Sequence, residues 1–157
     1  MTDPVETEAS STGEPEELIV EIGKYGFVDA PATVSTGAID AGLALAFLNK
    51  TTRRAGVLHL PGLDATPRFI DDFLVLAYLA SDPGDLIAIW MGGGAVLDAG
   101  SADRAMADRA WFERRLRSQF PRAEFSTGWI DQPDTLAEVL VVTEPPAIRA
   151  KRWTFHD

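Results

Sequence analysis

The chain has 157 residues, of which 46% are hydrophobic and 24% are charged, a length and composition that fit one globular domain. Its formal net charge is −10, and residues 1–17 hold six acidic residues and no basic one. Proteins that bind the phosphate backbone need clustered Lys and Arg, so nucleic acid is excluded as an expected partner. The chain has no cysteine, which excludes disulfides, thiolate metal sites and cysteine nucleophiles.

The first 16 residues mix Glu, Ser, Thr, Pro and Gly without hydrophobic periodicity, which is the composition of a disordered acidic tail. Residues 17–157 are expected to form a single folded domain. The N-terminus has no basic region followed by an apolar one, and no later stretch offers about 18 consecutive apolar residues. We therefore expect a cytoplasmic protein that does not insert into a membrane.

Short apolar runs between turn signals predict a series of strands in the first 60 residues. Leu18–Ile22 is the first, Tyr25–Val28 continues it after a break, and Thr33–Ile39 follows. The next two runs, Leu43–Leu48 and Ala55–Leu60, are separated by six polar residues. That connection is too short for a parallel crossover, so these two strands are expected to form a hairpin.

Two helices are expected in the second half of the chain. Thr66 and Pro67 start a helix with a broad apolar face over residues 66–80. Ser101 is expected to cap a second helix over residues 101–119, although Arg109 and Glu113 fall on its apolar side. Further strands are expected at Leu86–Met91, Glu124–Ile130, Leu136–Thr143 and Ile148–Trp153. Hairpins with two inserted helices indicate the α+β class, with layered sheets of mostly antiparallel strands.

The run Gly92-Gly93-Gly94 follows a predicted strand, as the loop of a nucleotide-binding site does. The spaced glycine pattern fails because Leu97 stands where the third glycine belongs, and no Gly-Lys-Ser/Thr pair follows. The run is typical of a turn where backbones approach closely. The two histidines, His59 and His156, are too few for a convergent metal site, so neither a metal nor a cofactor is expected.

A hydrolase would need a nucleophile beside His59. The Gly-x-Ser-x-Gly elbow is absent, but Ser35 or Thr36 could lie near His59 in space. A single histidine on an apolar strand is more often a satisfied core residue. The chemistry of the residues leaves both interpretations open.

Three segments, Thr36–Phe47, Ala55–Pro61 and Trp90–Ala95, together resemble the CheD family in order and spacing. CheD proteins are the chemoreceptor glutamine deamidases of bacterial and archaeal chemotaxis. The resemblance implies a CheD-like α/β sandwich. It also implies a mechanism in which a cysteine thiolate attacks a glutamine side-chain amide, a histidine acts as base and a threonine orients the histidine.

In this chain the family's threonine corresponds to Thr36, its histidine to His59 and its cysteine to Gly42. Glycine has no atom that can form an acyl intermediate, so the three positions are relics of a catalytic site. We expect them to lie together at the ends of adjacent strands. The resemblance then implies a catalytically inactive domain that acts by protein binding in chemotaxis or related signalling. The alternatives are an amidohydrolase that uses Ser35 or Thr36 with His59, and an unrelated α+β binding protein.

The partners that the resemblance implies are a chemoreceptor helix and a CheC-type phosphatase. A groove that receives a helix is apolar with a polar rim. The candidate lining in this chain is the Gly92–Gly94 turn with Trp111 and Trp129, although tryptophan is equally typical of an ordinary core.

Overall fold

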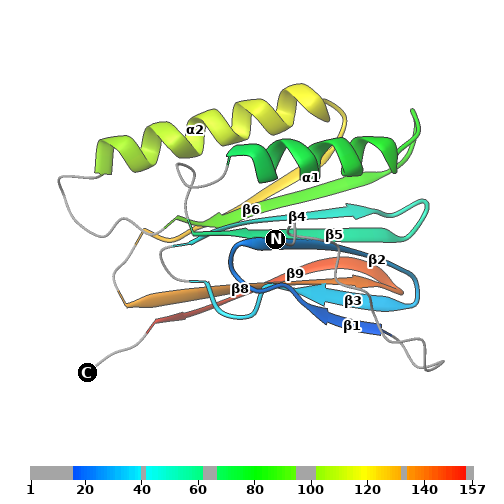
Figure 1. Ribbon diagram of the computed structural model, residues 1–157, viewed down its shortest axis with the longest axis horizontal. Helices are drawn as coiled ribbons and strands as arrows, with labels where there is room; N and C mark the ends of the chain where they lie inside the picture. Colours follow the sequence, from blue (N-terminus) through cyan, green and yellow to red (C-terminus); the bar gives the residue numbers. More distant parts are fainter. Residues whose placement is uncertain (1–15, 40–41, 62–66, 95–101, 132–133, 155–157) are drawn as a thin grey trace.

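The structure, a computed structural model, describes residues 16–39, 42–61, 67–94, 102–131 and 134–154. Its described elements form three layers: a pair of helices, a five-stranded sheet B in the middle, and a four-stranded sheet A (Figure 1). The helices cover one face of sheet B, and sheet A packs against the other. The predicted α+β class, with two helices and layered, largely antiparallel sheets, is confirmed.

Sheet B has the strand order β2-β5-β4-β6-β7. β4 pairs antiparallel with both β5 and β6, whereas β6 and β7 are parallel and are joined through a helix. The predicted hairpin is confirmed, because Leu43 pairs with Leu60 and Asn49 with Arg54. The strands are β2 Lys24–Asp29, β4 Leu43–Asn49, β5 Arg54–Leu60, β6 Ile87–Gly93 and β7 Glu124–Trp129.

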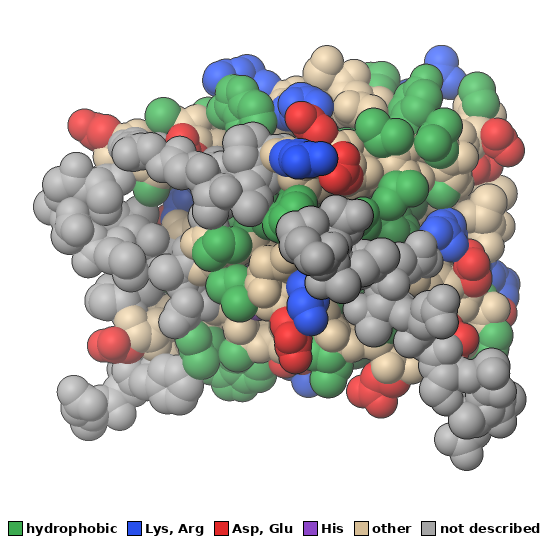
Figure 2. All heavy atoms as spheres, in the orientation of Figure 1, with side chains coloured by type: hydrophobic (Ala, Val, Ile, Leu, Met, Phe, Trp, Pro, Cys, Tyr) green, Lys and Arg blue, Asp and Glu red, His purple; other side chains and the backbone are tan. Residues whose placement is uncertain are grey.

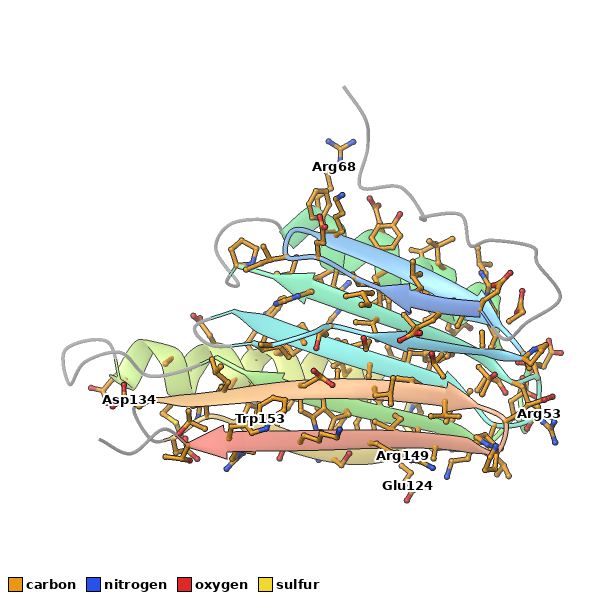
Figure 3. The ribbon with its side chains drawn as sticks, turned by 90° about the horizontal axis from the view of Figure 1, so that it is seen from below. Arg53, Arg68, Glu124, Asp134, Arg149 and Trp153 are labelled. Atoms are coloured by element: carbon orange, nitrogen blue, oxygen red, sulfur yellow. The ribbon has the colours of Figure 1, made fainter. Side chains whose placement is uncertain are left out.

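Sheet A has the order β1-β3-β8-β9 and joins the two ends of the described chain. β1 and β3 are parallel, and the other two pairs are antiparallel. The described residues place no helix over the outer face of this sheet, which carries Arg149 and Trp153 of β9 at its edge (Figure 3). The strands are β1 Glu16–Ile19, β3 Ala32–Ser35, β8 Thr135–Thr143 and β9 Pro146–Thr154.

Several predicted boundaries in sheet A were wrong. Glu16 belongs to β1 and not to the tail, and the run after Gly23 does not continue β1 but forms β2 of the other sheet. β3 ends at Ser35 because Gly37 has a φ of 68°, so Ile39 makes only an isolated bridge to Ala137. β9 starts at Pro146, earlier than expected, because Glu144 and Pro145 alone form the turn of the β8–β9 hairpin and Pro146 already pairs with Thr143.

Both predicted helices are present, as α1 Pro67–Leu79 and α2 Ala102–Gln119. The expected start and cap residues Thr66 and Ser101 lie outside the described residues, as do residues 1–15 of the predicted tail.

Sheet B is buried on both faces, and its two faces differ in side-chain size. All seven residues of β4 are buried. The face toward sheet A carries mainly small residues, whereas the face toward the helices carries large ones, and each face has its own hydrophobic cluster. The first cluster includes Ala44, Ala46, Ala55, Val57 and Ala88; the second includes Leu45, Phe47, Leu58, Ile89 and Met91, with Phe73 and Phe112 from the helices.

The buried side chain of Asn49 fastens the β4–β5 hairpin to the end of α1. Its carbonyl oxygen accepts the backbone N–H groups of Thr51 and Thr52, each at 3.0 Å. Its amide nitrogen donates to the Ala80 carbonyl at 3.2 Å and to the Asp85 carboxylate at 2.8 Å. The side-chain oxygen of Asn49 therefore accepts two hydrogen bonds and its nitrogen donates two. These four bonds hold the β4–β5 turn and the end of α1 in place.

We expect the substitution Asp85→Asn to lower stability in a pH-dependent way. The Asp82 backbone N–H and the Asn49 amide both donate to Asp85 and hold its pKa below the ordinary value of 3.8. A carboxyl with a lowered pKa stabilises the folded state above 3.8, and this stabilisation is lost as the pH falls through the lower, folded-state pKa. Urea denaturation over a pH series should show a difference from wild type at neutral pH that shrinks in acid. A difference that is constant with pH would contradict this role, and Asp72→Asn, on the exposed side of α1, is the matched control.

Candidate functional site

Several of the positions singled out from the sequence lie at one end of sheet B. The register of sheet B places Leu60, Leu43, Gly93 and Trp129 in one row across four strands. β4 starts at this row, and β5, β6 and β7 end at it. The candidate positions Gly42, His59 and Gly92–Gly94 therefore come together although they are distant in sequence.

The structure brings Gly42 and His59 into contact, and both are buried. A β-carbon at Gly42 would lie 3.5 Å from Nε2 of His59. The same β-carbon would lie 2.7 Å from the carbonyl oxygen of Leu60, closer than carbon and oxygen atoms pack. Residue 42 thus faces the imidazole, as the resemblance implies for a nucleophile, but the backbone of β5 fills the space of a side chain.

The orientation of His59 is set by the chain between β1 and β2. Its Nδ1 lies 3.3 Å from the carbonyl oxygen of Val20, and a carbonyl oxygen can only accept a hydrogen bond. This contact places a proton on Nδ1 and, in the neutral ring, leaves Nε2 as the acceptor. The acceptor nitrogen is the one directed at Gly42.

Thr36 and Ser35, the alternative nucleophiles, serve other purposes. The hydroxyl of Thr36 donates to the Gly37 carbonyl at 2.7 Å and accepts the Val139 N–H at 3.3 Å. Its proton is therefore given to a carbonyl and not to a base, which is the reverse of what nucleophilic attack requires. Ser35 alternates with the inward-facing Val34 in β3 and so points to the outer face of sheet A, whereas His59 lies in the layer between the sheets.

The predicted close approach of backbones at Gly92–Gly94 is confirmed, but the predicted turn is wrong for Gly92 and Gly93, which are the last two residues of β6. A side chain at Gly92 would collide with the Trp90 ring and the Gly128 carbonyl. Gly93 has a φ of 83°, and a side chain there would collide with the carbonyl oxygen of Gly42. The N–H of Gly94 donates to that same carbonyl at 2.6 Å. Gly92 and Gly93 are buried by these contacts, so they serve packing.

We expect Gly93→Ala to destabilise the fold more than Gly84→Ala. Both glycines have left-handed backbone conformations, with φ of 83° and 98°, so both variants carry a strain of about 1–2 kcal/mol. Only Gly93 also abuts a backbone, whereas Gly84 has no atom within 4 Å of its β-carbon position. Steric overlap should add about 1–3 kcal/mol to the loss in Gly93→Ala, measured by chemical denaturation. Equal losses would refute the close-approach explanation.

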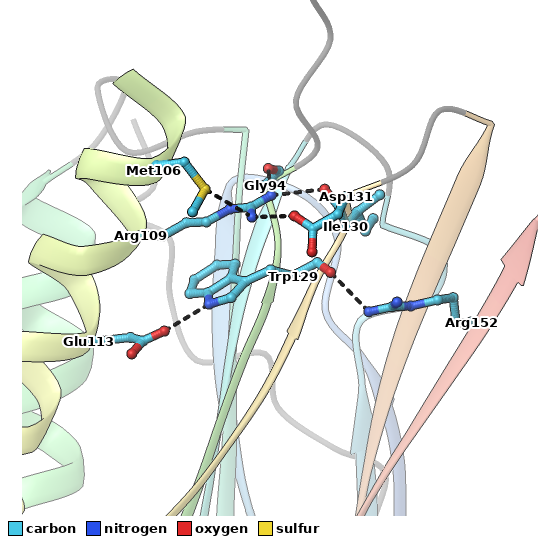
Figure 4. Close-up of polar contacts among 8 residues, drawn as sticks. All are labelled: Gly94, Met106, Arg109, Glu113, Trp129, Ile130, Asp131 and Arg152. Carbon is cyan, nitrogen blue, oxygen red and sulfur yellow. Dashed lines mark hydrogen bonds and ion pairs between the residues drawn. The ribbon is translucent and has the colours of Figure 1, made fainter. Parts of the chain in front are cut away.

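A polar cluster at this end is built around Arg109 of α2 (Figure 4). The residue is 6% exposed. Its guanidinium donates to the Asp131 carboxylate at 2.6 Å, to the Gly94 carbonyl at 2.7 Å and to the Ile130 carbonyl at 2.8 Å. One arginine thus joins α2 to the ends of β6 and β7.

Trp129 extends this cluster. The Arg109 guanidinium carbon lies 5.3 Å from the centre of its ring, its indole N–H donates to Glu113 at 2.9 Å, and its carbonyl accepts a bond from Arg152 of β9 at 2.9 Å (Figure 4). Gly94 packs against the same ring, with its β-carbon position 3.6 Å from a ring atom. Trp111, the other predicted lining residue, is 42% exposed on α2.

The sequence analysis did not predict that Arg109 and Glu113 join α2 to sheet B, although the sequence contains an indication of it. Both residues interrupt the apolar side of the second helix, where a charged side chain needs a partner. The structure supplies that partner from β6, β7 and the residues that follow them.

We expect Arg109→Leu to lower the free energy of unfolding by about 2 kcal/mol or more, because two carbonyl oxygens lose a charged donor. Arg114→Leu is the matched control, since Arg114 is exposed on the same helix, and should change stability by about 0.5 kcal/mol or less. Urea denaturation of both variants tests the difference. An Arg109→Leu variant as stable as the control would show that the cluster is dispensable.

A second candidate site lies at the other end of β4. There the ends of both helices and the loop before β6 form a groove of about 510 Å³, lined by residues that include Tyr78, Asp82, Asp85, Leu86 and Phe120. This volume is within the range of pockets that bind small molecules or single side chains of a partner.

The described ranges contain no group of three or more His, Asp or Glu residues placed to hold a metal ion. Within the same ranges, neither helix has the length and apolarity needed to cross a membrane. Comparison of the chain with protein-family models and with curated proteins finds no match in either.

Proposed function

We propose that this domain is a catalytically inactive, CheD-like protein-binding domain of chemotaxis or a related bacterial signalling circuit. The observation that carries the proposal is the packing of Gly42, where the resemblance puts the nucleophile. Nε2 of His59 lies 3.5 Å from the β-carbon position, which supports the likeness to a base-and-nucleophile pair. The Leu60 carbonyl at 2.7 Å supports the loss of chemistry, because it occupies the space a nucleophilic side chain needs.

Deamidation of glutamine needs a nucleophile to attack the amide carbon and a base that takes up its proton and later returns it to the departing ammonia. Position 42, which faces this base, is a glycine and offers it no nucleophile to deprotonate. His59 instead donates from Nδ1 to Val20 and holds the segment between β1 and β2 against β5. We assign it a structural role.

The partners we propose are those of the resemblance, a chemoreceptor helix or a CheC-type phosphatase, met in the cytoplasm. A domain without catalytic activity can still affect signalling by binding a partner and blocking part of its surface. Its effect is then stoichiometric and not catalytic, and it depends on the concentration of the domain.

We expect the purified protein to bind a chemoreceptor fragment or a CheC-type phosphatase without releasing ammonia from receptor glutamines. Calorimetry measures the binding, and mass spectrometry with an ammonia assay measures deamidation. Ammonia released by the unmodified protein would overturn the inactive assignment. Failure to bind either partner would overturn the proposed circuit.

We expect Gly42→Cys to remain inactive in the same assay, because the Leu60 carbonyl prevents the thiol from taking up its position. Gly42→Ala is the matched control, and both variants should lose about 1–3 kcal/mol of stability through overpacking. Ammonia release by Gly42→Cys, but not by Gly42→Ala, would show that residue 42 has room for a nucleophile.

A further inference from the structure

The outer face of sheet A is more apolar than a sheet face in contact with water usually is. An antiparallel sheet with one solvated face normally carries polar side chains on that face. Along β8, fully buried residues alternate with half-buried ones, and the half-buried residues point outward: Leu136, Glu138, Leu140 and Val142. Three of these four are large and apolar, so β8 carries apolar side chains on both of its faces.

The neighbouring strands extend this apolar surface. Ile19 of β1 is 61% exposed, and Trp153 of β9, which pairs with Leu136, is 40% exposed. In Figure 2, green hydrophobic side chains reach the lower margin of the molecule, where sheet A lies, with red acidic side chains beside them. We call this surface the outer patch; its apolar members are Ile19, Leu136, Leu140, Val142, Ala147 and Trp153.

The charged residues of sheet A are divided between its two edges. The four strands together hold three acidic and three basic residues, so this sheet is neutral in a chain of net charge −10. Glu16 and Glu17 lie on the edge strand β1, whereas all three basic residues lie on the opposite edge strand, β9. The third acidic residue, Glu138, is on β8 opposite Lys151.

The charges on the two edges are available to a partner. Glu17 and Arg149 point outward, because each alternates with an inward-facing residue, and among the described residues neither side chain makes a hydrogen bond or an ion pair. Of the acidic residues next to the sheet, Glu144 is paired with Arg53 at 2.8 Å, and Asp134 precedes β8 at the end of the sheet away from β1. One edge of the outer patch is therefore acidic and the other basic.

This division of charge determines how two copies of the chain can meet. Pairing of β9 with β9, or of β1 with β1, brings like charges together along the edge. Pairing of β1 with β9 from edge to edge does not close, because each copy keeps one free edge and the chain of copies continues. A two-fold axis parallel to the strands instead stacks sheet A of one copy on sheet A of the other, with β1 of each opposite β9 of the other.

We propose that the outer patch is the interface of a homodimer in which the two sheets A stack about this axis. The central strands β3 and β8 lie beside the axis, so Leu140 and Val142 of the two copies meet in the middle and lose contact with water. Glu17 of each copy lies within reach of Arg149 of the other, because facing sheets pack about 10 Å apart and both side chains are long. The inference goes beyond the proposed signalling role, and the helix layers of both copies face outward in this dimer.

Sedimentation equilibrium of the whole protein at about 10–100 μM, a range that detects weak dimers, tests the proposal. The wild type should sediment as a dimer. Leu140→Gln should weaken dimerisation by about tenfold, because it removes apolar contact beside the axis. Leu79→Gln is the matched control, since Leu79 is 74% exposed on α1, in the layer farthest from sheet A, and it should leave the dimer unchanged.

Charge reversal tests the orientation of the two copies without touching the apolar residues. Glu17→Arg and Arg149→Glu should each weaken the dimer by about threefold or more, because each places like charges opposite one another. The double variant should recover the wild-type affinity, and the differences should shrink at high salt. Circular dichroism should show that all variants are folded.

A wild type that remains a monomer at about 100 μM overturns the proposal. So does a dimer that Leu79→Gln dissociates and Leu140→Gln does not, because the helix layer then forms the contact. A double charge variant that is weaker than either single variant overturns the placement of β1 opposite β9. None of these results bears on ammonia release or on binding of a receptor fragment, so the proposed function stands or falls separately.

Discussion

Burial of sheet B on both faces is the constraint on which the rest of the structure depends. A strand such as β4, with every residue buried, has to satisfy two neighbours of different kinds, a second sheet and a helix layer. The small side chains of Ala44 and Ala46 let sheet A approach on one side, while Leu45 and Phe47 reach the helices on the other. Alternation of size thus replaces the usual alternation of polarity in this strand.

The same constraint explains the polar residues inside the domain. Any polar group that enters a layer covered on both sides loses its water and needs a protein partner. Asn49 meets this need at one end of β4, and His59 and Arg109 meet it at the other, each by binding backbone carbonyls. In each case the polar side chain joins segments that no strand pairing connects, so these residues hold the layers in register.

Local patterns were enough to predict the β4–β5 hairpin and both helices, because a short polar connection and a helical apolar face depend on residues near in sequence. The separation of β1 and β2 into different sheets was not predictable, since it depends on partners more than 30 residues away, such as His59 opposite Lys24. The proximity of Gly42 to His59 agrees with part of the grouping expected from the family spacing, whereas Thr36, the third position, is bonded to Gly37 and Val139. The Leu60 carbonyl that closes the position of Gly42 could not be foreseen, because sequence does not give the distance between neighbouring backbones.

Sheet A unites residues 16–35 with residues 135–154, and its tie is visible in Ala32, whose N–H and carbonyl both bond to the Thr143 hydroxyl at 2.9 Å. Every strand of sheet B precedes residue 135 in the chain. During synthesis on the ribosome, all strands of sheet B are therefore made before β8 and β9, which help to cover its alanine-rich face. Such an uncovered apolar face is a place where nascent chains associate with one another. A chain whose synthesis stops before residue 135 contains both helices and most strands, but it lacks β8 and β9. The face of sheet B that these two strands help to cover then stays exposed, and we expect such a chain to bind chaperones or to aggregate.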